Sequence, residues 1–177
     1  MSASAAIQMM AEGGALTGLQ AESGSIGAIM ATANTSPLAP GATVSVTTFD
    51  TGSNTELTLA GMILPSNDGF AGLDAWTIPT TAGTYTIMIN AYDAGTEAND
   101  ELLTPMSGAP GVLGIPAAPG MDSGTGGTGV TLEETNQTVH IHRGVIGDTS
   151  DLDGASDLDS RIHRWLNPVA KVVVTVQ

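Results

Sequence analysis

Apolar and polar residues alternate in several short runs of this chain, and such alternation predicts β-strands. The strand patterns occupy residues 43–49, 57–64, 84–91, 138–142 and 169–176. Residues 50–54 read as a turn, so we expect the first two strands to pair as a hairpin. In the third strand, Tyr85, Ile87 and Ile89 share one face, which we expect to point inward.

Two short helices are expected before the first strand. Residues 2–12 place Ile7, Met10 and Ala11 near helical spacing, with Ser2 or Ser4 as the N-cap and two glycines as the stop. A second, weaker helix pattern covers residues 16–21. Residues 24–40 are small and turn-forming, so residues 1–40 are predicted to be a helical and irregular N-terminal segment.

The composition favours one domain. A chain of 177 residues with 41% hydrophobic content can bury one core, and its 23 Gly and 9 Pro indicate short strands joined by frequent turns. Residues 104–130 form a long Pro/Gly-rich loop, with residues 123–129 as its tip. There is no Cys, so disulfides and thiolate chemistry are excluded. We predict a single all-β domain over residues 1–177, an antiparallel β-sandwich with one or two short N-terminal helices.

The charge distribution excludes some partners. The formal net charge is −14, and all four basic residues lie at or after Arg143. Such a chain repels phosphate backbones, so nucleic-acid binding is not expected. No run of about 18 apolar residues is present, so no transmembrane segment is expected. The N-terminus also lacks the basic region of a secretory signal.

Two acidic loops follow strand patterns, at residues 65–74 and 91–101. Calcium binds six to eight oxygens from carboxylates, amides, main-chain carbonyls and water. Asp93 directly follows the third strand, and Gly95 would let the chain turn so that Glu97 points back. The residues therefore suggest one calcium site, although two solvated acidic turns fit them equally well. Its candidate ligands are Asp68, Asp93, Glu97 and Asp100.

A histidine cluster offers a second metal hypothesis. His140 and His142 would point to the same face of a strand, and His163 could complete a zinc or copper site. The alternative is that Arg143 and the acidic residues 151–159 simply hydrogen-bond the rings. No nucleophile motif or phosphate-binding loop is present, so we expect no enzymatic activity.

Residues 148–159 invite comparison with an EF-hand loop. Placing Gly154 at the sixth loop position leaves Thr149 at the first and Ser160 at the twelfth, where acidic ligands belong. We therefore favour a solvated loop partly neutralised by Arg161 and Arg164, with a looser second cation site as the alternative.

Residues 65–74 followed by residues 92–97 resemble the motif pattern of the spondin domain, the module of F-spondin and mindin. The Asn99-Asp100-Glu101 run, the His140-Ile141-His142 run and residues 165–169 are similar to the bacterial single-domain branch of this family. The resemblance covers roughly residues 5–176. It implies a secreted antiparallel β-sandwich with adhesive roles and a calcium ion at one end, held by Asp93 and Glu97 with Asp68 behind them.

The chain departs from this family at two points. Animal members carry cysteines and have a Trp where this chain has Gly69, so their partners are not carried over. Family members also begin with one or two strands that are not seen here, which would leave an open sheet edge and favour self-association.

The expected function is a non-enzymatic calcium-binding module for adhesion or assembly, secreted or at the cell surface, with the periplasm as the other location. Its partner would be a protein or cell-surface component. One alternative is a subunit of an extracellular homopolymer or filament completed by strand pairing between chains. The other is a transition-metal protein that uses the three histidines.

Overall fold

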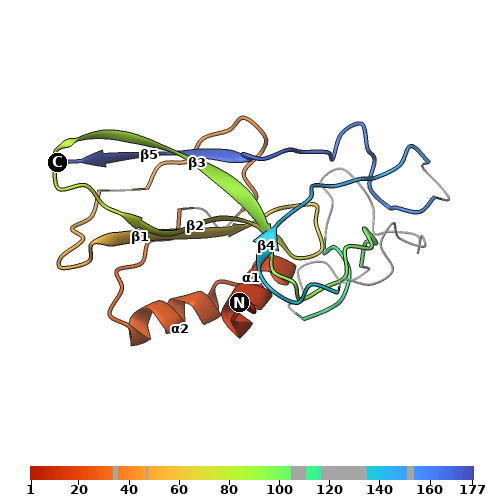
Figure 1. The fold of residues 1–177 in the computed structure, drawn as a ribbon, viewed down its shortest axis with the longest axis horizontal. Helices are drawn as coiled ribbons and strands as arrows, with labels where there is room; N and C mark the ends of the chain where they lie inside the picture. The colour runs from red at the N-terminus through yellow and green to blue at the C-terminus, as the bar shows by residue number, and fades with distance from the viewer. Residues whose placement is uncertain (34–35, 47, 105–110, 117–134, 151–153) are drawn as a thin grey trace.

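The computed structural model describes residues 1–177 except 34–35, 47, 105–110, 117–134 and 151–153. In that part of the chain, two helices precede five strands (Figure 1). The elements are α1 (Ala5–Gly13), α2 (Thr17–Ser25), β1 (Glu56–Met62), β2 (Gly69–Thr77), β3 (Gly83–Asp93), β4 (His140–Ile141) and β5 (Ala170–Val176). The described part of the long loop at residues 104–130 is short, and its predicted tip at residues 123–129 lies outside the described residues.

β3 connects the two halves of the sheet. Its first half, Gly83 to Ile89, pairs with β5, and its second half pairs with β2 and, through Tyr92 and Asp93, with β4. β1 lies outside β2, and every one of these pairings is antiparallel. Figure 1 shows β3 running diagonally from the β5 side to β4. The prediction of a mainly antiparallel β-fold with two short helices is confirmed.

The third and fifth predicted strands correspond to β3 and β5, and the burial of β3 alternates as expected. Tyr85, Ile87 and Ile89 are the more buried positions of the β3 half that pairs with β5. The long run at 84–91 has the β-branched and aromatic residues that suit a pleated surface. The fourth strand shortens to His140–Ile141.

Two predictions were wrong: the strand at 43–49 and its pairing with the strand at 57–64. The described residues of 43–49 belong to no strand, and Val44, Val46 and Phe49 are exposed. The strand predicted at 57–64 pairs instead with β2, which begins at Gly69 inside a segment predicted to be a loop. A tight turn explains this choice, because Ser66 Oγ accepts from Gly69 N at 3.0 Å and Ile63 N donates to Gly69 O at 2.9 Å. These two contacts fix the turn at residues 63–68 and the register of β1 on β2.

Helix α1 begins and ends as its sequence indicates. Ser4 is the N-cap and accepts from Ile7 N at 3.2 Å, and Gly14 ends the helix with a φ of 71°. α2 is longer than predicted and has no buried residue. Among the described residues, no helix is long and apolar enough to cross a membrane.

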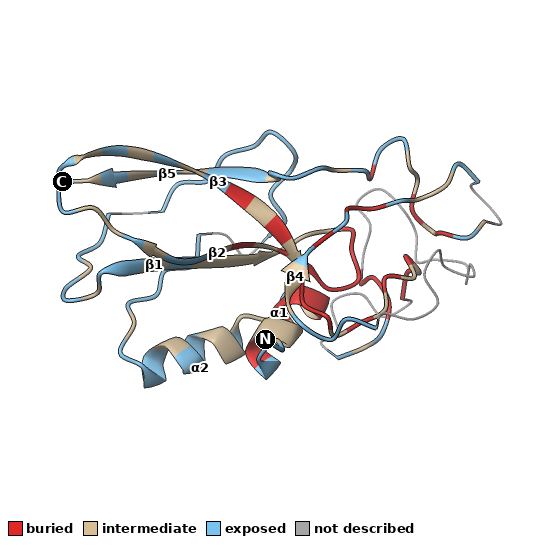
Figure 2. Ribbon diagram, viewed as in Figure 1, coloured by how far each residue is buried: buried red, intermediate tan, exposed pale blue. Residues whose placement is uncertain are grey.

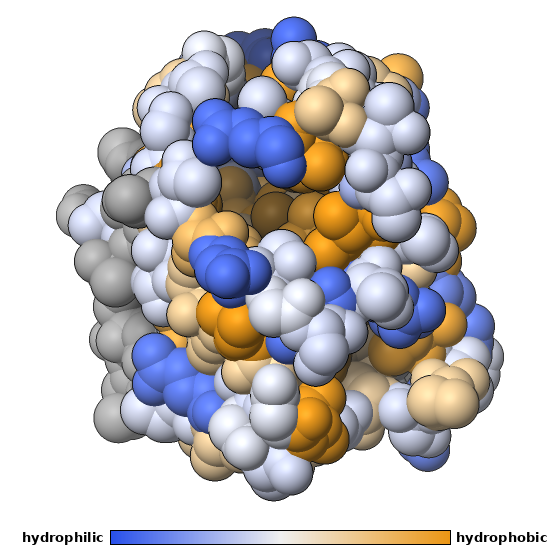
Figure 3. Space-filling model, turned by 90° about the vertical axis from the view of Figure 1, so that its left-hand side faces the viewer, coloured by the Kyte–Doolittle hydropathy of each residue, from blue (hydrophilic) through white to orange (hydrophobic). Residues whose placement is uncertain are grey.

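The buried residues gather at one end of the molecule. Figure 2 shows them at the junction of α1, the end of β3, β4 and the loops that follow. There Met10 and Ala11 of α1 pack with Phe70 and Ala94. At the opposite end, the inward residues of β3 and β5 are only half-buried, and Figure 3 shows apolar side chains around a hollow. The core therefore supports the end that carries the acidic loops.

Candidate functional site

The hairpin turn before β2 and the segment after β3 lie against each other. Ala94 N donates to Asp68 O at 3.2 Å, and Asn67 Nδ2 donates to Glu97 Oε1 at 3.1 Å. β2 and β3 pair in register from Gly69 and Asp93, so the sheet itself brings the two acidic segments together. The structure thus places Asp68, Asp93 and Glu97 in one region.

Gly95 makes the turn between Asp93 and Glu97. Its φ is 69°, and its N–H donates to Asp93 Oδ1 at 2.7 Å. A Cβ at this position would meet main-chain atoms of residues 136–138 at 2.8 Å. Only glycine combines this backbone conformation with this close approach. The local sequence Asp93-Ala94-Gly95 therefore fixes the path of the chain into Glu97.

Asp93 is held on both carboxylate oxygens. Oδ1 accepts from Gly95 N, and Oδ2 accepts from Asn99 Nδ2 at 2.6 Å. His140 Nε2 lies 3.9 Å from Oδ2. Asp93 is almost fully buried at the end of β3, so these donors stabilise its charge. Asp93 therefore holds Gly95 and Asn99 of the segment after β3 in place.

Asp100 and Glu101 are also anchored by donors. Asp100 is half-buried, and its Oδ1 accepts from Asn67 Nδ2 at 2.9 Å and Leu102 N at 3.1 Å. Glu101 is buried and accepts main-chain N–H bonds from residues 146 and 147 at 2.7 Å each, together with Ser156 Oγ at 2.6 Å. Glu101 therefore fastens residues 146, 147 and 156 to the end of β3 and has no oxygen left open.

Asp68 has one held oxygen and one open oxygen. Oδ2 accepts from Thr96 N at 2.8 Å, Glu97 N at 3.1 Å and Thr96 Oγ1 at 3.2 Å. Oδ1 is buried and has no hydrogen bond. Buried polar atoms in folded proteins are nearly always paired, so an unpaired oxygen at this position indicates that a partner is missing.

Glu97 and Glu12 show the same arrangement. Glu97 Oε1 accepts from Asn67 Nδ2 and from Gly114 N, whereas its Oε2 is buried without a hydrogen bond. Glu12 Oε1 accepts from Gln8 Nε2 at 2.8 Å, and its Oε2 is likewise buried and open. Three segments of the chain therefore each contribute one fixed and one open carboxylate oxygen.

The electrostatic environment disfavours these charges. Burial and, to a smaller extent, the Asp93 charge raise the pKa of Asp68 to about 6. The hydrogen bonds from residues 96 and 97 oppose this rise. Burial likewise raises the pKa of Glu97 to about 7, with the charges of Glu12 and Asp68 adding to the effect. A buried carboxylate in this position needs either a proton or a cation.

Comparisons with protein-family models, curated proteins and solved structures found no match to this chain. The site is therefore interpreted from its own geometry.

The open oxygens are of the donor type that hard cations prefer. In the part of the chain that the structure describes, no three His, Cys, Asp or Glu side chains surround one point closely enough to hold a metal ion. Asp68 Oδ1, Glu97 Oε2 and Glu12 Oε2 are each buried without a hydrogen bond. Calcium tolerates irregular geometry with oxygen ligands at about 2.3–2.6 Å, so small rotations of carboxylates suit it. Their oxygens suit zinc or copper less well, since those ions favour nitrogen and sulfur.

The three histidines make separate contacts. His140 Nδ1 lies 2.7 Å from Thr138 O, and His142 Nδ1 accepts from Gly144 N at 2.9 Å. His142 is buried against Trp165, with ring centroids 4.8 Å apart, and its burial lowers its pKa. His163 Nδ1 accepts from Asp159 N at 3.0 Å. The described residues, which include all three, contain no three-ligand group that brings them around one metal.

The EF-hand-like run at 148–159 is organised by main-chain donors. Asp148 Oδ1 accepts from Ser150 N at 2.9 Å, and Oδ2 accepts from Ala155 N at 2.8 Å and Ser156 N at 3.1 Å. These donors lower the pKa of Asp148 below its usual range. The described residues of this run therefore form a turn around Asp148, and residues 151–153 lie outside the description.

Glu12 was missed by sequence reasoning. A signal was present, because Glu12 is a single carboxylate beside Met10 and Ala11 on the apolar face of a short helix, directly before the two glycines. A buried acid in that position is rare without a partner. Only the fold shows that the residues before it, Met10 and Ala11, pack with Phe70 and Ala94.

Proposed function

We propose that this protein is a non-enzymatic calcium-binding module in which one ion links the turn before β2 to the segment after β3. One observation carries the proposal: Asp68 and Glu97 are buried on adjacent segments, and each keeps an oxygen without a hydrogen bond. Neither Asp68 Oδ1 nor Glu97 Oε2 has a hydrogen-bond donor in the structure. A calcium ion there would supply the missing positive charge and the missing ligand.

The protein's own residues define what the ion would organise. Asn67 bridges Glu97 and Asp100, and Asp68 holds the main chain of residues 96 and 97. These contacts already align the two segments, so binding would fix the shape of this end of the molecule. We further propose that the strands form a β-sandwich of the spondin type and that a protein or cell-surface partner outside the cell reads this end. The antiparallel ladders and the residue motifs support that extension.

Calcium titration tests the proposal. Isothermal titration and thermal unfolding at pH 7.5 should show binding by the wild type, with magnesium binding more weakly because it demands stricter geometry. Stabilisation should reach about 2.7 kcal/mol at a hundredfold excess over Kd. The double variant Asp68→Asn/Glu97→Gln should lose it, whereas Glu56→Gln at the exposed start of β1 should not. A wild type with no heat and no melting shift in millimolar calcium overturns the proposal.

Self-association is a second candidate function with its own observation. The inward residues of β3 and β5 are half-buried, and Val44, Val46 and Phe49 lie exposed outside any described strand. A strand from a second copy would cover such a face and continue the ladder. Analytical ultracentrifugation and electron microscopy separate an oligomer or filament from a monomer. A monomer at high concentration rules this candidate out and leaves the calcium proposal intact.

A further inference from the structure

We infer that Glu12 of helix α1 is a third direct ligand of the proposed cation site, so that cation binding fastens α1 to the β-sheet. This inference rests on the proposed function, since it assigns a further ligand to the same ion. It changes the ligand set suggested by the sequence, in which Asp93 and Asp100 stood beside Asp68 and Glu97.

The first argument is the hydrogen-bonding pattern. Glu12 is only 1% exposed, and its Oε2 has no hydrogen bond. Gln8, one turn earlier, holds Oε1 at 2.8 Å and so fixes the direction of the carboxylate. Asp68 and Glu97 are held in the same way, with one oxygen fixed and one open. In Asp93 and Glu101, by contrast, both oxygens accept hydrogen bonds.

The second argument is the position of Glu12. Met10 and Ala11, directly before Glu12, pack with Phe70 and Ala94, which belong to the two acidic segments. The charges of Glu12 and Asp68 both act on Glu97. The three carboxylates come from α1, from the turn before β2 and from the segment after β3. Three buried like charges repel each other unless a cation lies among them. Calcium sites commonly combine several such carboxylates.

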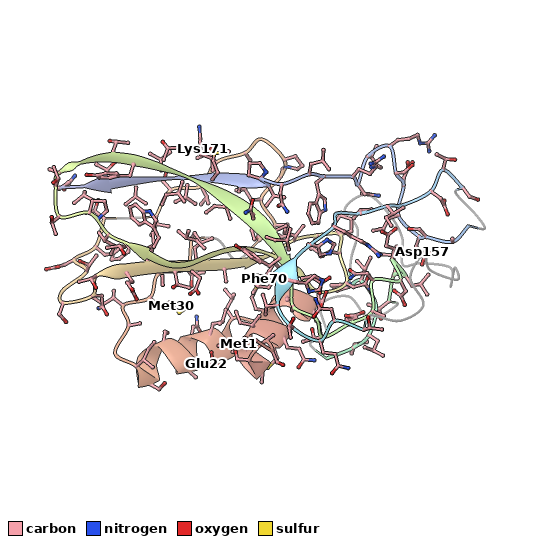
Figure 4. The ribbon with its side chains drawn as sticks, in the orientation of Figure 1. Met1, Glu22, Met30, Phe70, Asp157 and Lys171 are labelled. Atoms are coloured by element: carbon pink, nitrogen blue, oxygen red, sulfur yellow. The ribbon has the colours of Figure 1, made fainter. Side chains whose placement is uncertain are left out.

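The third argument is what surrounds Glu12 on the helix. Met10 and Ala11 are fully buried, and they pack with Phe70 and Ala94 at the same junction. Figure 4 shows Phe70 beside α1, at the end of the sheet that carries the acidic segments. α1 is a helix of 9 residues and would be marginal alone, so it depends on this docking. An ion bound through Glu12 therefore stabilises the packed position of α1.

A matched pair of variants tests the role of Glu12. Glu12→Gln removes the charge and keeps the shape, and Glu56→Gln makes the same change at the exposed start of β1. Glu12→Gln should weaken calcium binding at least about tenfold by isothermal titration, because the number of charged ligands sets the affinity of such sites. In EDTA the same variant should melt at a higher temperature than the wild type, because it removes a buried carboxylate that repels Glu97. Glu56→Gln should change neither property.

These opposite changes separate a ligand from a structural residue. A purely structural Glu12 would lower the melting temperature in EDTA and leave the calcium affinity unchanged, which overturns the inference. If the wild type binds calcium and Glu12→Gln binds it equally well, the inference fails and the proposed function stands. A wild type that binds no calcium ends both.

Hydrogen exchange on the wild type gives a readout that needs no variant. Calcium should slow amide exchange in α1 as well as in the turn before β2 and in residues 94–101. Exchange in β5, at the far end, should change little. Protection confined to the turn and to residues 94–101, with α1 unaffected, overturns the inference even if Glu12→Gln fails to fold.

Discussion

Glu97 and Glu101 lie on the same segment, and both are nearly buried, with 5% and 4% of their surface exposed. Glu101 receives three donors that reach both of its oxygens, two from the main chain and one from Ser156. Glu97 receives donors on Oε1 alone and keeps Oε2 open. Burial by itself therefore does not mark a functional carboxylate. The hydrogen-bond donors around each carboxylate distinguish Glu101, which holds the fold together, from Glu97, which keeps one oxygen open for a ligand.

The largest expected effect comes from removing the satisfied member of this pair. Glu101→Ala leaves three donors without their acceptor and detaches residues 146, 147 and 156 from the end of β3. It should lower the free energy of unfolding by about 4 kcal/mol, and calcium should not restore it. Urea unfolding with and without calcium measures both properties. A loss below about 1 kcal/mol would remove the contrast with Glu97.

The turn that presents Glu97 can be broken at Gly95. Gly95→Ala puts a Cβ within 2.8 Å of main-chain atoms of residues 136–138, at a φ of 69°. We expect a loss of about 3 kcal/mol in the free energy of unfolding, together with weaker calcium binding. Gly61→Ala in β1 is the control, since a Cβ there meets nothing within 4 Å. Equal effects of the two substitutions in thermal unfolding would contradict the role given to Gly95.

The open carboxylates should make stability fall as the pH rises in EDTA. The pKa of Glu97 is raised from 4.5 to about 7 on folding, so the folded state binds the proton more tightly than the unfolded chain does. Its contribution to stability is complete below pH 4.5 and is lost as the pH rises through 7, by about 3 kcal/mol. Asp68 acts in the same direction between 3.8 and about 6.

Urea unfolding across pH 4 to 8 measures this slope. Glu97→Gln should remove the upper part of it, because the amide does not titrate. Saturating calcium should flatten or reverse it, since the ion binds the deprotonated carboxylates. Stability in EDTA that rises between pH 5 and 8 contradicts the interpretation of both groups.

The smallest effect concerns the helix that carries Glu12. Ser4 caps α1 through its Oγ, which accepts from Ile7 N at 3.2 Å. Ser4→Ala should cost about 1 kcal/mol in the free energy of unfolding. Ser2→Ala, outside the cap, should cost almost nothing. If α1 belongs to the cation site, Ser4→Ala also weakens calcium binding slightly, and a fluorescence-based calcium titration would detect the change.

Much of the local structure follows from the sequence because it depends on neighbouring residues. Ser4 and Gly14 set the ends of α1, the alternation at 84–91 gives β3, and the Asp93-Ala94-Gly95 run gives its turn. The strand at 57–64 was also recognisable. Its partner was not recognisable, because alternation at 43–49 looks the same as alternation in a paired strand, and only the contacts of the folded turn show that β1 pairs with β2.

The sequence by itself determined that two acidic segments follow strands and that Gly95 turns the chain toward Glu97. Only the tertiary structure decided which carboxylates remain open, since each oxygen depends on donors from distant segments. Gly114 and Asn67 donate to Glu97, and residues 146, 147 and 156 donate to both oxygens of Glu101. A carboxylate's chemistry is set by the donors and charges that the fold gathers around it, and these contacts have no local pattern.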